Sequence, residues 1–148
     1  MKKILTIIIL LFSAFLLMSQ KQKEEIFKGI ASFYHSKYNG KTTSNGEKYN
    51  SKKYTAASNT LKLGTYAKVT NPENGKSVYV KINDRLAKYN KRLIDLSKIS
   101  ATQLGYTKKG ITDVIVEVVP EDEGKEQIAQ QYSYKKVASN KHRKSTGI

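Results

Sequence analysis

Two aspartates bracket the passage from a strand to a helix near the middle of the chain. An alternating run over 77–83 ends at Asp84, and Asp95 follows eleven positions later, just before a short helical pattern. Two carboxyl groups in one groove can act as acid and electrostatic stabiliser, because burial or a neighbouring like charge keeps one of them protonated. Each also has a simpler interpretation, Asp95 as the cap of the helix beginning near Ser97 and Asp84 as part of an Asx turn.

Short strands must position these carboxylates. Alternation of apolar and polar residues predicts strands over 29–34, 65–70, 77–83, 93–96 and 111–119. The Pro and Asn-Gly within Asn71–Gly75 indicate a hairpin loop. Lys98–Leu104 has a helical pattern, with Ser97 as N-cap and Gly105 as C-cap.

A polar stretch over 35–53 separates the first strand from the others and carries two Asn-Gly turn signals. A loop of this length in a small domain is usually functional or disordered. About six short strands and one short helix within 29–120 predict an all-β domain that closes into a small barrel, because closure removes the exposed edges of an open sheet.

The two ends of the chain differ from this domain. Lys2 and Lys3 precede an apolar run from Ile4 to Met18, and Ser19 offers a cleavage point, so 1–19 is predicted to be a signal peptide. The run is shorter than the roughly 20 residues of a membrane-spanning helix, which leaves an uncleaved anchor as the alternative. Residues 20–28 are predicted to be a flexible lead-in, and 121–148 a disordered, polar and basic tail.

Composition narrows the function classes. The chain has no cysteine, which excludes a disulfide, a catalytic thiol, a thiolate zinc site and a lipid-bearing cysteine. A net charge of +15 suits an anionic polysaccharide, lipid or nucleic acid, or is simply a solvated lysine-rich surface. Export argues against nucleic acid, and with it against a DNA-binding barrel. We expect no cofactor and no metal, because His35 is the one histidine in the domain.

An ordered set of motifs is more specific than any single one. The set consists of Gly29–Tyr34, Thr43–Tyr49, Thr55–Ala57, Leu61–Gly64, Val69–Asn71, Asn74-Gly75, Asn83–Arg85 and Arg92–Ser97. In order and spacing it resembles the rare lipoprotein A (RlpA) family over essentially all of 29–120. The resemblance implies a six-stranded double-psi β-barrel. It also implies a lytic transglycosylase that cuts peptide-free (denuded) peptidoglycan strands and leaves 1,6-anhydro-N-acetylmuramic acid ends.

The chain departs from the family pattern at three places. Asn50 stands where the family has an aspartate, Ser58 where it has a histidine, and Leu86-Ala87 where Gly-Pro is common. The first two changes are expected to remove ionisable groups from the cleft. They favour the alternative function, a non-catalytic, expansin-like barrel that binds glycan without cutting it.

The resemblance also ranks the site residues. Asp95 matches the acid/base position of related barrel enzymes, and Asp84 would tune it or stabilise an oxocarbenium-like transition state. Glu47, expected across the groove, is the other candidate acid or a substrate ligand, with a solvated loop glutamate as the simpler interpretation. Arg85 would bind the lactyl carboxylate of muramic acid, or pair with Asp84. Three loop tyrosines are suited to sugar contact: Tyr38, Tyr49 and Tyr89.

The implied partners are peptidoglycan glycan strands and, at most, other cell-envelope or division proteins. We expect a monomer that is exported to the periplasm, the cell envelope or the medium. The absence of cysteine predicts that it is not a lipoprotein.

Overall fold

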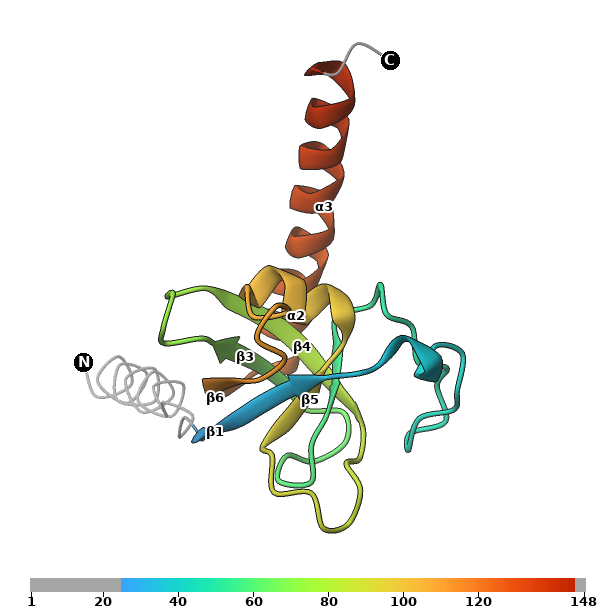
Figure 1. Cartoon of the computed structure of the whole chain (residues 1–148), viewed down its shortest axis with the longest axis vertical. Coiled ribbons are helices and arrows are strands. Elements are labelled where there is room, and N and C mark those ends of the chain that lie inside the picture. The colour runs from blue at the N-terminus through green and yellow to red at the C-terminus, as the bar shows by residue number, and fades with distance from the viewer. Residues whose placement is uncertain (1–24, 146–148) are drawn as a thin grey trace, which may run out of the picture.

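The computed structural model describes residues 25–145 (Figure 1). The predicted signal peptide and most of the predicted lead-in lie outside the described residues. The strands are β1 (Ile26–Phe33), β2 (Thr55–Ala57), β3 (Tyr66–Thr70), β4 (Ser77–Asp84), β5 (Ile94–Leu96) and β6 (Thr112–Val119). The helices are a 3-10 turn, η1 (Ser36–Tyr38), and two α-helices, α2 (Lys98–Leu104) and α3 (Glu121–Ser145).

The six strands form a closed barrel in the order β1-β5-β2-β4-β3-β6, and β6 pairs with β1 to complete it. Two pairs are parallel, β1 with β5 and β2 with β4, and the other four are antiparallel. The predicted all-β closed barrel is therefore confirmed. Within the described part of the chain no sheet edge is left open, so every strand has a hydrogen-bonding neighbour on each side.

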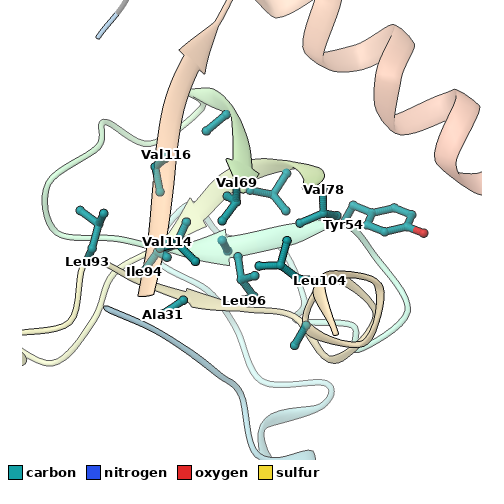
Figure 2. Close-up of a cluster of buried hydrophobic side chains, with 14 of the residues drawn as sticks. Ala31, Tyr54, Val69, Val78, Leu93, Ile94, Leu96, Leu104, Val114 and Val116 are labelled. Carbon is teal, nitrogen blue, oxygen red and sulfur yellow. The ribbon is translucent and has the colours of Figure 1, made fainter. Parts of the chain in front are cut away.

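Alternating side chains fill the barrel. In β4, Val78, Val80 and Ile82 are fully buried, while the residues between them are only partly buried. Val69 of β3 pairs with both Val78 and Val116, so three neighbouring strands bring valines to one core position. Figure 2 shows Val69, Val78 and Val116 in one cluster with Ile94 and Leu96 of β5 and Leu104 of α2. Each such valine or isoleucine contributes about 1.5–3 kcal/mol by leaving water.

One strand is absent from the prediction. The residues of β2, Thr55–Ala57, are all buried between β4 and β5, whereas the sequence suggests only a continuation of the polar loop. Three residues are too few to show a period of two, and Thr-Ala-Ala has neither the bulk nor the charge that would mark one face. The strand forms because its two neighbours supply the hydrogen bonds.

The predicted helix is found over Lys98–Leu104, with Ser97 at the N-cap position and Gly105 ending it in a left-handed conformation at φ +83°. Ser97 does not cap through its side chain, since its hydroxyl lies 2.7 Å from that of Ser100 in the buried interior.

The prediction of a disordered tail is wrong for 121–145. These residues form α3, which begins directly after Pro120 and has Glu121, Asp122 and Glu123 in its first turn, where the helix dipole favours acidic groups. Tertiary contacts stabilise its first half. Gln131 bonds to both the N–H and the carbonyl of Tyr79 on β4, at 2.7 and 3.0 Å.

The second half of α3 projects away from the barrel (Figure 1). The part of the chain that the structure describes thus has two α-helices, where the sequence predicts one. Neither is long and apolar enough to cross a membrane, a finding that covers 25–145 alone.

Candidate active site

The two aspartates flank one small residue on adjacent strands. Ala57 of β2 is the cross-strand partner of Asp84 on β4 and of Asp95 on β5. Paired residues on neighbouring strands project to the same face, so the three lie side by side. Two strand spacings put the Cα atoms of the aspartates about 10 Å apart. A methyl group between them leaves the space above β2 open.

A bulge makes this arrangement possible. Along the β2–β4 ladder Ala56 pairs with Ile82, but Ala57 pairs with Asp84, so Asn83 is skipped. The skipped residue is buried and bonds to Glu47, which Lys81 also contacts. The extra residue therefore brings the last side chain of β4 onto the face that carries Asp95.

The open space is a cleft of about 570 Å³. Its floor includes Ala57, and both aspartates line it. The polar loop after β1 supplies one wall, and the loop between β4 and β5 supplies the other. The loop residues include Tyr34, His35, Lys37, Tyr38, Lys41, Thr42, Thr43, Tyr49, Arg85, Leu86, Ala87, Asn90 and Arg92.

Asp84 is held by four hydrogen-bond donors. Its Oδ1 accepts from the Ser44 backbone N–H (2.9 Å), the Ser44 hydroxyl (2.7 Å) and the Arg85 backbone N–H (2.8 Å). Its Oδ2 accepts from the Tyr34 hydroxyl at 2.7 Å. Burial raises the pKa of the Asp84 carboxyl, but these bonds together outweigh burial and leave the pKa below its ordinary value. Asp84 is therefore a fixed anion at neutral pH.

Asp95 is held by one cation. Arg92 donates from Nε to Oδ1 at 2.7 Å and from an Nη to Oδ2 at 2.8 Å, which is the bidentate geometry that matches a guanidinium to a carboxylate. These bonds raise the pKa of Arg92 further above its ordinary value. Asp95 lies within β5 and Ser97 occupies the N-cap position, so the helix-cap interpretation of Asp95 is wrong.

Tyrosines form the wall nearest Asp84. The rings of Tyr34 and Tyr49 stack with centroids 4.4 Å apart, and Tyr38 meets Tyr34 edge-on at 6.0 Å. Lys37 and Lys41 each place the ammonium 5.3 Å from the centre of the Tyr38 ring. Burial raises the pKa of the Tyr34 hydroxyl well above its ordinary value, and the Asp84 carboxylate adds to this, so Tyr34 stays a hydrogen-bond donor.

Glu47 is not brought together with the aspartates. It lies outside the cleft lining, in a separate hollow that also contains Tyr54, Lys81 and Lys125. Its carboxylate accepts from Asn83 Nδ2 at 3.0 Å and from Lys81 Nζ at 3.2 Å. The Asn83 bond is the largest cause that lowers the pKa of Glu47. The carboxylate thus braces the turn over 43–47 against β4.

Two predicted substrate ligands are placed differently from the expectation. Arg85 lines the cleft, but its guanidinium donates to the backbone carbonyls of Ser58 and of Leu61, the latter at 2.6 Å. Tyr89 is 87% exposed and lies outside the cleft lining. Tyr38 and Tyr49 do line the cleft.

The first two departures from the family pattern, at Ser58 and Asn50, also lie outside the cleft lining, whereas Leu86 and Ala87, the third, line it. Ser58 is fully buried, donates to the Leu93 carbonyl at 2.8 Å and accepts from the N–H groups of Thr60 and Leu61. Asn50 is exposed and accepts from the Lys52 N–H in a local turn. The expectation that these positions place their side chains in the cleft is therefore wrong for this chain.

Three residues that hold the two aspartates carry no role in the sequence analysis: Tyr34, Ser44 and Arg92. All three lie within motifs that the sequence analysis singles out, and that is the signal that could have found them. Arg92, three positions before Asp95, is the clearest case. Among residues 25–145 no group of three or more histidine, cysteine, aspartate or glutamate side chains could hold a metal ion.

Comparisons with known proteins show the family of the chain. The family model described as lytic transglycolase matches residues 26–116. Endolytic peptidoglycan transglycosylase RlpA of Haemophilus influenzae is 46% identical over 97 residues, which cover 66% of this chain and 34% of that protein. The chain thus spans about a third of the length of the curated relatives it matches.

Solved structures support the fold alone. The Streptomyces papain inhibitor has a TM-score of 0.53 at 18% identity, and the match covers 65% of this chain and 96% of the inhibitor. The apo expansin of Clavibacter michiganensis has a TM-score of 0.52 at 20% identity, and the match covers 66% of this chain and 52% of the expansin. With the family match, these similarities confirm the double-psi β-barrel.

Proposed function

Because the chain belongs to the RlpA family of lytic transglycolases, we propose that it is an endolytic peptidoglycan lytic transglycosylase acting on peptide-free glycan strands. The observation that carries the proposal is the convergence of Asp84 and Asp95 on one cleft, on either side of Ala57. The products would be strands ending in 1,6-anhydro-N-acetylmuramic acid.

The proposed reaction needs no water. The bond between C1 of N-acetylmuramic acid and the bridging oxygen breaks, and a proton is donated to that oxygen as it leaves. The C6 hydroxyl of the same muramic acid then attacks C1 and gives its proton back. One carboxyl group can therefore act first as acid and then as base, and it ends the cycle as it began.

We assign the acid/base role to Asp95 and the stabilising role to Asp84. Asp84 has a lowered pKa and four donors, which suits a permanent anion facing the positive charge that develops at C1. Asp95 has one partner, Arg92, whose side chain can change its contacts more readily than the backbone groups that hold Asp84. Glu47 braces the loop that carries Ser44.

The cleft walls suit a polysaccharide. The tyrosine rings at 34 and 38 offer flat apolar faces with polar edges for sugar rings, and Tyr49, only 3% exposed, supports Tyr34 by stacking on it. Lys37 and Lys41 on this wall and Arg92 on the other add positive charge to the cleft, which matches a glycan bearing free lactyl carboxylates.

The binding-module alternative rests on one observation. Both aspartates already have partners in this structure, so neither presents a free carboxylic acid. A barrel that holds glycan without cutting it would need no more than the tyrosines and the cations.

The purified protein, incubated with amidase-treated peptidoglycan, separates the two functions by mass spectrometry of the products. We expect 1,6-anhydromuramyl ends, and we expect Asp95→Asn to lower their rate of formation about 10²–10⁴-fold while glycan pull-down persists. Pull-down without anhydro products from the native protein would establish the binding module instead. Undiminished product from Asp95→Asn would show that Asp95 is not the acid.

A further inference from the structure

The pairing of Asp95 with Arg92 conflicts with the acid role. A carboxyl group must carry a proton to protonate the leaving oxygen, whereas a bidentate guanidinium holds both carboxylate oxygens as acceptors. In the free protein both carboxylate oxygens of Asp95 are therefore engaged by Arg92 and neither can donate to a leaving oxygen. Something must take Arg92 away from it.

The exposures of the two partners indicate how this happens. The side chain of Arg92 is 37% exposed, whereas that of Asp95 is 14% exposed. An anion entering the cleft thus meets the guanidinium first. Arg85, the other arginine of the cleft, is already bound to two backbone carbonyls, so Arg92 is the arginine whose partner is a side chain and can be exchanged.

We infer that Arg92 is the specificity-determining residue of the cleft: it exchanges the Asp95 carboxylate for the lactyl carboxylate of muramic acid, and this exchange frees Asp95 to take up a proton. The inference rests on the proposed function. One carboxylate replaces another in the same bidentate geometry, so Arg92 keeps its hydrogen bonds. Asp95 then accepts a proton from solvent and donates it to the glycosidic oxygen.

The exchange accounts for a preference for peptide-free strands. A stem peptide is attached to the lactyl carboxyl through an amide bond, which is neutral and offers no second anionic oxygen. A strand bearing peptides would therefore leave Arg92 on Asp95. The charged groups that line the cleft around the pair are Asp84, Lys37, Lys41 and Arg85, with the titratable His35 beside them. Most of them are basic, which favours entry of an anion rather than its exclusion.

The test compares two forms of one glycan. Peptide-free strands are prepared by amidase digestion, and half are coupled to methylamine so that each lactyl carboxylate becomes a neutral amide. Affinity and rate of anhydro-end formation are measured for the wild type, Arg92→Gln and Arg92→Lys. Lys88→Gln is the matched control, because Lys88 is an exposed cation in the same loop and lies outside the cleft lining.

We expect the wild type to bind carboxylate strands several-fold more tightly than methylamide strands. The ratio should lie below the roughly 10-fold of a newly formed charge-assisted pair, because Arg92 gives up its bonds to Asp95. The ratio of the two affinities should fall to near 1 in Arg92→Gln and be unchanged in Lys88→Gln. It should be intermediate in Arg92→Lys, which keeps the positive charge but cannot make a bidentate contact. The same ordering is expected for the ratio of kcat/KM values.

The inference would be overturned by equal affinity of the wild type for both strands, or by an undiminished affinity ratio in Arg92→Gln. If Lys88→Gln lowered the affinity ratio as much as Arg92→Gln does, the inference would also be overturned, because the discrimination would then depend on net charge alone. These outcomes are separate from a failure of the proposed function. If the protein forms no anhydro ends, the proposed function fails, but the affinity ratios can still be measured. If it forms anhydro ends and the ratio does not depend on Arg92, only the exchange is refuted.

Discussion

Tyr34→Phe removes a single oxygen from the site and tests the description of Asp84 directly. The substitution keeps the ring that stacks on Tyr49 and deletes the hydroxyl that donates to Asp84 Oδ2 at 2.7 Å. Oδ2 then loses its donor, while the three bonds to Oδ1 remain. We expect a less stable barrel at neutral pH.

The magnitude follows from the charge on the acceptor. A hydrogen bond to a charged group contributes about 1.5–3 kcal/mol when buried. Asp84 is only partly buried, so we expect the low end, about 1–1.5 kcal/mol. In a domain of this size, 1 kcal/mol corresponds to about 4–8 °C in Tm.

The sign of the pH dependence is fixed by the lowered pKa of Asp84. Its stabilising effect is complete above the unfolded-state pKa of about 3.9 and is lost as pH falls through the lower folded-state pKa. The Tm gap between wild type and Tyr34→Phe should therefore shrink as pH is lowered from about 7 to about 3. The control is Tyr89→Phe, the same chemical change on a side chain that is 87% exposed.

Thermal melts of the three proteins across this pH range decide the matter. A Tm gap for Tyr34→Phe that is constant with pH would mean that the lost bond is not to an ionised Asp84. A gap no larger than that of Tyr89→Phe would mean that the bond contributes nothing.

Two other substitutions test the remaining assignments. Glu47→Gln should keep kcat/KM within about threefold, because the Glu47 side chain itself lies outside the cleft lining; a loss of 100-fold or more would make it the acid in place of Asp95. Gly124→Ala should destabilise the protein by about 1–2 kcal/mol, since an added Cβ would lie 2.3 Å from the Tyr66 Cβ. Ser133→Ala, on an exposed position of α3, is the helix control, and an unchanged Tm for Gly124→Ala would refute the close packing of α3 on the barrel.

The parts of the fold that the sequence predicts are those with a strong local pattern. The run over 77–83 alternates, Asn71–Gly75 has turn chemistry, and Lys98–Leu104 ends at a glycine, and all three are confirmed. β2 and α3 are missed for a common reason. Their stability comes from distant partners: β4 and β5 for the three residues of β2, and the backbone of Tyr79 for α3.

The candidate site divides in the same way. Asp84 and Asp95 are found because they stand at the ends of patterned elements, whereas Tyr89 and Glu47 were placed in the cleft by residue type and motif alone. A tyrosine or glutamate in a polar loop can face either side of the barrel. Arg92 shows the converse. Arg85 follows Asp84 directly in sequence, but its side chain bonds to the Ser58 and Leu61 carbonyls. The arginine that pairs with an aspartate side chain is Arg92.

The bulge between β2 and β4 connects these placements. With a regular ladder, Ala57 would pair with Asn83, and Asp84 would project to the other face, since a shift of one residue exchanges the faces of a strand. The bulge instead pairs Asp84 with Ala57 and places it in the cleft with Asp95. Asn83 and Lys81 of β4 both hold the Glu47 carboxylate, and the Asn83 bond lowers the pKa of that carboxyl. The single irregularity thus assembles the pair of aspartates, while Glu47 is held outside the cleft lining, so both carboxyl groups of the acid–base chemistry we propose come from β4 and β5.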